Sequence, residues 1–143
     1  MGFLSGMDIA ASGLTAQRLR MDVISDNIAN VDTTKTEDGT VYTRKYVVLQ
    51  EQQNNFSDVL ENASSEVTGG VKVSEIGEDS SDPELVYDPT NADANADGYV
   101  EYPNVDITQE MVDMISAYRS YEANVTAFSA YKDMALKSLE IGS

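Results

Sequence analysis

The segment that decides the fold is ITQEMVDMISAYRSYEANVTAFSAYKDMALKSLE, residues 107–140. Its apolar side chains recur at alternating steps of four and three residues, and only Lys132 interrupts the series. The stripe comprises Ile107, Met111, Met114, Tyr118, Tyr121, Val125, Phe128, Ala135 and Leu139. A repeat of this length predicts a long helix that packs along a coiled-coil seam. Asp106 and Gln109 have the spacing of a capping box, so we expect the helix to begin there.

A weaker heptad pattern occupies the N-terminus and predicts a second long helix. Ser12 and Gly13 lie inside it. They either let another helix approach closely or form a tolerated weak point, since Gly costs about 1 kcal/mol relative to Ala in a helix. We expect the two helices to pair and to present one assembly seam, and Tyr131, which lies off it, to face a neighbouring subunit. The assembly seam comprises Met7, Leu14, Met21, Ile28, Ile107, Met111, Met114, Tyr118, Tyr121, Val125, Phe128 and Leu139.

Between the predicted helices the sequence is typical of short strands. Residues 41–49 are rich in β-branched and aromatic side chains, residues 70–76 alternate, and 85–87 and 99–102 are shorter candidates. Turn-forming pairs that contain Gly or Pro separate them. We therefore predict an α+β fold in which long terminal helices pair as a coiled coil around a small β-rich insert. The expected division is an N-terminal axial helix over 1–35, a middle domain over 36–104 and a C-terminal axial helix over 105–143.

The charge distribution and composition exclude several classes of function. The chain has 143 residues, with 25 acidic and 9 basic side chains, a formal charge of −16, and neither His nor Cys. Fifteen of the acidic residues and only three basic ones fall in the middle domain, which therefore carries −12. A surface this acidic does not favour nucleic acid or anionic membranes. Without imidazole or thiol groups we expect no enzyme, no zinc site and no cofactor.

Three separated motifs carry a resemblance to a known family. The first is ASGLTAQRLRMDVISDNIANVDTT, residues 11–34, and the second is EMVDMISAYRSYEAN, residues 110–124. The third combines LVYDP at 85–89 with DANADGYVEYPNV at 93–105. Together they resemble the axial proteins of the bacterial flagellar rod and hook, and in particular the proximal-rod subunits. Within the first motif, the residues that carry the match are Asn27, Ala29, Asn30 and Thr34.

The resemblance implies a structural subunit of the basal-body rod that polymerises through its terminal helices and is required for motility. It implies export by the flagellar type III apparatus without a cleaved signal peptide, and a place in the rod within the periplasmic space. The implied partners are further copies of the chain, other rod proteins (the FlgB, FlgF and FlgG types), the rod adaptor FliE and the export apparatus. Direct membrane insertion is not expected. Phe3 and Met7 fit a loose motif for contact with the export gate.

Two alternatives remain open from the residues. The loop at 93–98 has Asp93, Asn95 and Asp97 at the spacing of the first half of an EF-hand, with Gly98 at the sixth position. The twelfth position is Asn104 rather than the bidentate Glu, so we expect no metal site and favour a loop in which these side chains bond their own backbone. A calcium-binding coiled-coil module and another member of the rod and hook family are therefore the competing predictions.

Overall fold

A computed structural model describes residues 3–52 and 69–141 of the chain. The described elements are α1 (Phe3–Ala29), β1 (Lys45–Glu51), β2 (Val71–Glu78), β3 (Glu84–Tyr87), β4 (Tyr99–Tyr102) and α3 (Ile107–Ile141). The fold is α+β, with two long helices around a small β-rich insert, which confirms the predicted class. No helix in the described part of the chain combines the length and the apolar character that crossing a membrane requires.

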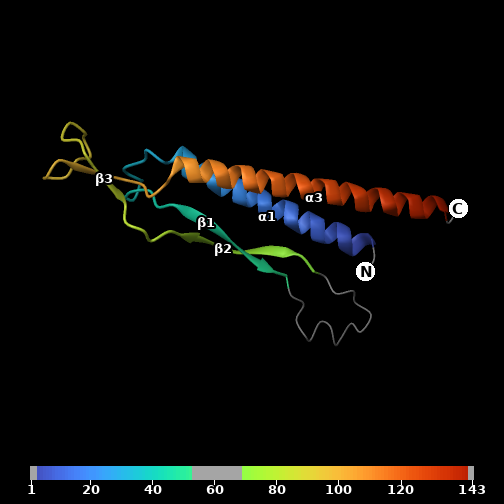
Figure 1. The fold of residues 1–143 in the computed structure, drawn as a ribbon. Helices are drawn as coiled ribbons and strands as arrows, with labels where there is room; N and C mark the ends of the chain where they lie inside the picture. Colours follow the sequence, from blue (N-terminus) through green and yellow to red (C-terminus); the bar gives the residue numbers. More distant parts are fainter. Residues whose placement is uncertain (1–2, 53–68, 142–143) are drawn as a thin grey trace, which may run out of the picture.

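The two helices lie side by side and run in opposite directions (Figure 1). Small residues of α1 let them approach: a Cβ added to Gly6 would lie 2.6 Å from the Tyr131 ring, and one added to Gly13 would lie 2.9 Å from the Asn124 amide. Gly13 is therefore a point of close helix approach. This agrees with the first of the two interpretations of Ser12 and Gly13 given above, in which small residues let another helix come close. The expectation that Tyr131 faces a neighbouring subunit is wrong, because its ring fills the space above Gly6.

The start of α3 follows the predicted capping. The Asp106 carboxylate accepts hydrogen bonds from the backbone N–H groups of Thr108 (2.8 Å) and Gln109 (3.3 Å). These bonds satisfy two donors that the first turn of a helix otherwise leaves unpaired. The Gln109 side chain donates to Asp113, 3.3 Å away, whereas in a capping box it would accept from the backbone N–H of Asp106. The helix thus begins where the sequence predicts.

Each strand pair forms its own antiparallel sheet. The β1–β2 hairpin packs along α1, with a register shift between Val48 and Leu49, so α1 lies between this hairpin and α3 (Figure 1). The β3–β4 pair lies past the end of the helix pair, and its Val100 is fully buried. The predicted first strand began too early: residues 41–44 are not in the ladder, because their side chains and backbone bond to other parts of the fold.

Candidate assembly interface

A cluster of polar side chains joins the elements where α1 ends and α3 begins. Its members come from α1, from the segment before β1, from the segment before α3 and from α3 itself. We call this cluster the polar junction; it comprises Asn27, Tyr42, Arg44, Asn104 and Glu110. Asn27 and Glu110 are both 0% exposed. Complete burial is unusual for the carboxylate of a Glu side chain. A buried polar group is tolerated only where its hydrogen bonds are satisfied.

Asn27 is satisfied completely. Its Nδ2 donates to the Lys45 carbonyl at 2.8 Å and to Glu110 Oε2 at 3.1 Å. Its Oδ1 accepts from the Lys45 N–H at 2.9 Å and from the Tyr42 hydroxyl at 3.0 Å. These four bonds use both donors and both acceptor sites of the amide. One side chain of α1 thereby fixes the first residue of β1 and a carboxylate of α3.

Arg44 neutralises the buried carboxylate. Its Nε donates to Glu110 Oε1 at 2.6 Å, a short charge-assisted bond. Its Nη groups lie 3.8 Å from Asp79 and 3.9 Å from Asp113. Hydrogen bonds from Ser81 hold the pKa of Asp79 below its usual value, with a smaller effect from the Arg44 charge. The guanidinium therefore links the β2 end of the insert to α3.

Two further contacts complete the junction. Asn104 Oδ1 accepts from the Arg44 N–H at 3.0 Å, and its Nδ2 donates to the backbone carbonyls of Asp79 and Ser81. Burial raises the pKa of Tyr42, and the charges of Asp26, Glu110 and Glu78 raise it further. The tyrosine hydroxyl is thus kept protonated and able to donate to Asn27.

The assembly seam divides between half-buried and exposed positions. Its half-buried members on α1 are Met7, Leu14, Met21 and Ile28. Its half-buried members on α3 are Met114, Tyr121 and Phe128. Its exposed members all lie on α3: Ile107, Met111, Tyr118, Val125 and Leu139. Tyr118 is 58% and Leu139 is 72% exposed, and the neighbouring Val112, Ile115 and Leu136 are exposed as well. A row of large apolar side chains on the surface of a helix is typical of an interaction surface.

The two halves of the seam meet at one point on a flank of the helix pair. A groove between the helices is lined by Met21 of α1 and by Met114, Ile115 and Tyr118 of α3. The β1–β2 hairpin covers a different side of α1, where Ser12 Oγ accepts from the Val71 N–H at 3.1 Å. The flank that carries the groove is therefore left open by the hairpin.

The motif residues Asn27, Ala29, Asn30 and Thr34 take different positions. Asn27 belongs to the polar junction, whereas Ala29 is exposed. Asn30 closes the end of α1, since its Nδ2 donates to the Asp26 carbonyl at 2.9 Å. The Thr34 hydroxyl donates to Asp93 at 2.9 Å and so ties the segment after α1 to the loop before β4. The motif is thus explained in part by contacts within the chain.

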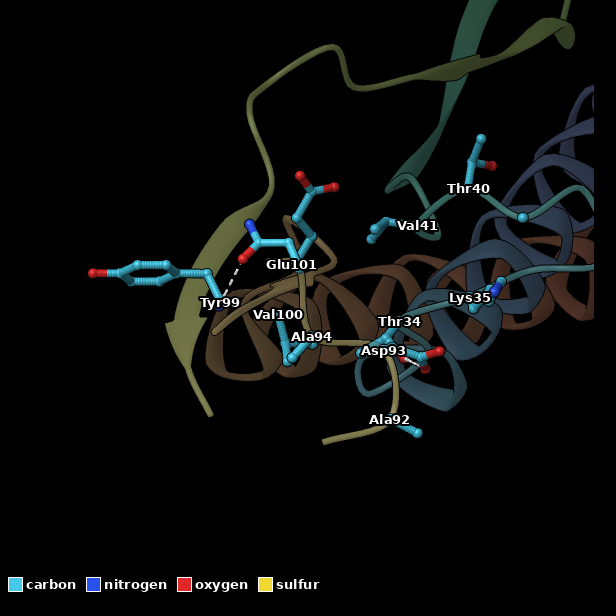
Figure 2. Close-up of a pocket in the computed structure, with 12 residues that line it drawn as sticks. Thr34, Lys35, Thr40, Val41, Ala92, Asp93, Ala94, Tyr99, Val100 and Glu101 are labelled. Atoms are coloured by element: carbon cyan, nitrogen blue, oxygen red, sulfur yellow. Dashed lines mark hydrogen bonds between the residues drawn. The ribbon is translucent and has the colours of Figure 1, made fainter. Parts of the chain in front are cut away.

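The loop that suggested calcium is used in internal bonds. Asn95 Oδ1 accepts from the N–H groups of Asp97 (3.0 Å) and Tyr99 (2.9 Å), and Gly98 turns the chain at φ +84°. Asp93 and Thr34 both line a hollow of about 520 Å³. Figure 2 shows the two side chains next to each other. Within the described residues, no three His, Cys, Asp or Glu side chains gather as ligands for a metal.

The export-gate residues lie at the start of α1. Phe3 opens the helix, but its side chain lies outside the described part of the structure. Met7 is half-buried. The contact with the export gate remains a prediction.

Sequence reasoning missed most of the polar junction. The sequence pattern places Tyr42 and Arg44 in a predicted strand and assigns no contact to Glu110. One signal was present, because Glu110 is an acidic residue on the edge of an apolar stripe. Its partners lie 66 residues away at Arg44 and 83 residues away at Asn27. Such distances in the sequence hide a cluster from any local pattern.

Comparisons with known proteins give the family. Residues 7–35 match the family described as "Flagella basal body rod protein", and residues 96–141 match "Flagellar basal body rod FlgEFG protein C-terminal". The chain is 54% identical to the flagellar basal-body rod protein FlgC of Bacillus subtilis, with 95% of each chain covered. It is 45% identical to FlgC of Borreliella burgdorferi (99% and 98% covered) and 44% identical to FlgC of Escherichia coli O6:H1 (99% of each). The chain therefore belongs to the FlgC family, and it is a structural protein of the flagellar basal-body rod.

Proposed function

We propose that the chain polymerises into the rod through the assembly seam, with residues 1–35 and 105–143 as the axial domain and 36–104 as the middle domain. The observation that carries this proposal is the row of exposed apolar side chains on α3. Ile107, Met111, Tyr118, Val125 and Leu139 follow the helix from its first turn to its last, and all are more than a third exposed.

The energetics favour a partner on this flank. Full burial of one large apolar side chain stabilises an association by about 1.5–3 kcal/mol. Several such residues in one row supply free energy of the same order as the freedom lost on association, which costs on the order of 4–15 kcal/mol. A helix from a neighbouring subunit is a suitable partner, since the exposed row follows α3 from its first turn to its last and helices pack by placing such ridges into grooves.

The test is to place a charge in the row. Val125→Asp introduces an unpaired carboxylate at a position that is 41% exposed in the single chain, so the fold tolerates it. We expect the variant to be expressed and exported but to leave cells without complete rods and non-motile. Ala123→Asp is the matched control, because it adds the same charge two positions away at an exposed site outside the row. Normal swimming of Val125→Asp, or equal loss in both variants, contradicts the assignment.

The finer parts of the function follow from the resemblance and belong to the same proposal. They are a place in the proximal rod within the periplasmic space, required for motility, and export by the type III apparatus without a cleaved signal. Partners of the FlgB, FlgF and FlgG types and the adaptor FliE are included. Membership of a basal-body rod family supports them. Photo-cross-linking from position 118 in motile cells identifies which of these proteins meets α3; a cross-link to none of them removes the partner assignment.

A further inference from the structure

The polar junction lies at one end of the antiparallel helix pair, and the remainder of the helix interface contains small residues. We propose that the junction sets the register of α1 against α3, and that this register aligns the two halves of the assembly seam. The alignment of the assembly seam rests on the proposed function, whereas the register of the two helices does not. Asn27 and Glu110 are then positioning residues for assembly, without contacting a partner themselves.

Away from the junction, the helix interface repeats every seven residues. Gly6 meets Tyr131, and Gly13 meets Asn124. Two heptads further along, Asn27 meets Glu110. Sliding α3 by seven residues brings Asn124 opposite Gly6, where a glycine again leaves room. Ala117, which is fully buried, then comes opposite Gly13. Small side chains and a heptad period thus leave a shifted register sterically acceptable.

The junction closes in one register only. All four hydrogen-bonding sites of Asn27 are used, and Glu110 Oε1 receives Arg44 Nε at 2.6 Å. A slide of seven residues removes Glu110 from Asn27 and carries Asn104, which lies three residues before α3, away from the Arg44 N–H. The slide also breaks the Arg20–Asp113 bond (3.3 Å) and brings Arg20 opposite Glu110. The buried Asn27 amide still loses its carboxylate partner and Glu110 loses its 2.6 Å bond from Arg44 Nε, which is unfavourable. A single buried polar residue in a helix interface is known to select register in this way.

The register matters for the assembly seam because the seam has members on both helices. Met21 of α1 and Met114 and Tyr118 of α3 line one groove. A slide of seven residues moves the helices by about 10 Å, at ~1.5 Å per residue. The groove would then be assembled from other residues, and a neighbouring subunit would meet a different surface.

The chain has no cysteine, so engineered pairs report the register directly. Gly13→Cys with Asn124→Cys tests the observed register, since a Cβ at position 13 lies 3.0 Å from Asn124 Cγ. Gly6→Cys with Asn124→Cys tests the shifted register and requires the slide of seven residues. Both pairs are introduced into the full-length purified chain and oxidised under identical conditions. With an intact junction we expect the first cross-link and essentially none of the second.

The junction is then weakened with Asn27→Asp, which replaces the two amide donors by a second carboxylate, and with the milder Glu110→Gln. We expect the shifted cross-link to rise about tenfold or more in Asn27→Asp, since loss of a buried partner shifts equilibria by more than that factor, and less in Glu110→Gln. Glu122→Gln, at an exposed position of α3, is the matched control and is expected to change neither cross-link.

Three results overturn the inference. One is the absence of the first cross-link in the chain with an intact junction. Another is an unchanged ratio of the two cross-links in both junction variants. The third is a parallel fall of both cross-links with the helical circular dichroism signal, which means that the junction supports the helices without selecting a register. Motility is measured separately: a changed ratio with normal swimming sinks the link to assembly while the register assignment stands.

Discussion

The two faces of α3 have opposite characters. The face toward α1 carries Glu110, Ala117 and Asn124, which are small or polar, and the first two are fully buried. The outer flank carries Met111, Tyr118 and other large apolar residues that remain exposed. A helix of an ordinary globular protein shows the reverse distribution. The fold of the single chain thus depends on close backbone approach and a polar junction, and the apolar surface stays exposed, as the proposed assembly contact requires.

The largest effect is expected from breaking the inner face at the junction. Glu110→Ala removes the fully buried carboxylate, so Arg44 loses its shortest bond and Asn27 loses one of its four hydrogen bonds. We expect a loss of about 3 kcal/mol in the free energy of unfolding, measured by chemical denaturation. Glu122→Ala, at an exposed position of the same helix, is expected to change it by no more than about 0.5 kcal/mol. Equal values for the two variants would remove the distinction between the faces.

A smaller effect is expected where the helices approach. Gly6→Ala normally stabilises a helix by about 1 kcal/mol. Here the added methyl would lie 2.6 Å from the Tyr131 ring, so we expect a net loss of about 1–2 kcal/mol from overpacking. In a Tyr131→Ala background the same change is expected to be stabilising. If Gly6→Ala stabilises the chain that retains Tyr131, the close approach is not maintained in solution.

Alkaline pH tests the hydroxyl of the junction. The pKa of Tyr42 is raised in the folded chain, chiefly by burial, above its ordinary value of about 10. Its contribution to stability is therefore fully present below about pH 10 and is lost as the pH rises through the raised pKa. Tyr42→Phe is expected to make unfolding less sensitive to pH in this range. Tyr118→Phe, at an exposed position, controls for the other tyrosines, and an identical pH profile in the two variants counts against the junction.

The smallest effect on folding is expected on the outer flank. Leu139 is 72% exposed, so Leu139→Ser is expected to change the free energy of unfolding by less than about 0.5 kcal/mol. The same variant is expected to weaken rod assembly, measured as the fraction of cells with complete basal bodies, because it removes apolar area from the proposed contact. A loss of stability comparable with that of Glu110→Ala would mean that the outer flank is part of the core of the chain.

The sequence located the helices well and their facing residues only in part. Asp106 caps α3 as predicted, because capping depends on residues adjacent in the chain. The heptad pattern identified Met114, Tyr121 and Phe128, which are half-buried, together with Tyr118 and Val125, which are exposed. Periodicity marks apolar residues but does not distinguish a contact within the chain from one between chains. The inner positions Ala117 and Asn124 escaped the pattern because one is small and the other is polar.

The sequence by itself determined the fold class, the two long helices, the placement of the acidic charge in the insert and the resemblance to rod and hook proteins. All of these depend on local periodicity, composition or contiguous motifs. The tertiary structure decided which flank of α3 stays open, how closely Gly6 and Gly13 let the helices approach, and that Asn27, Arg44 and Glu110 form one buried cluster. These features depend on residues far apart in the chain, whose side chains meet only when the antiparallel register is formed.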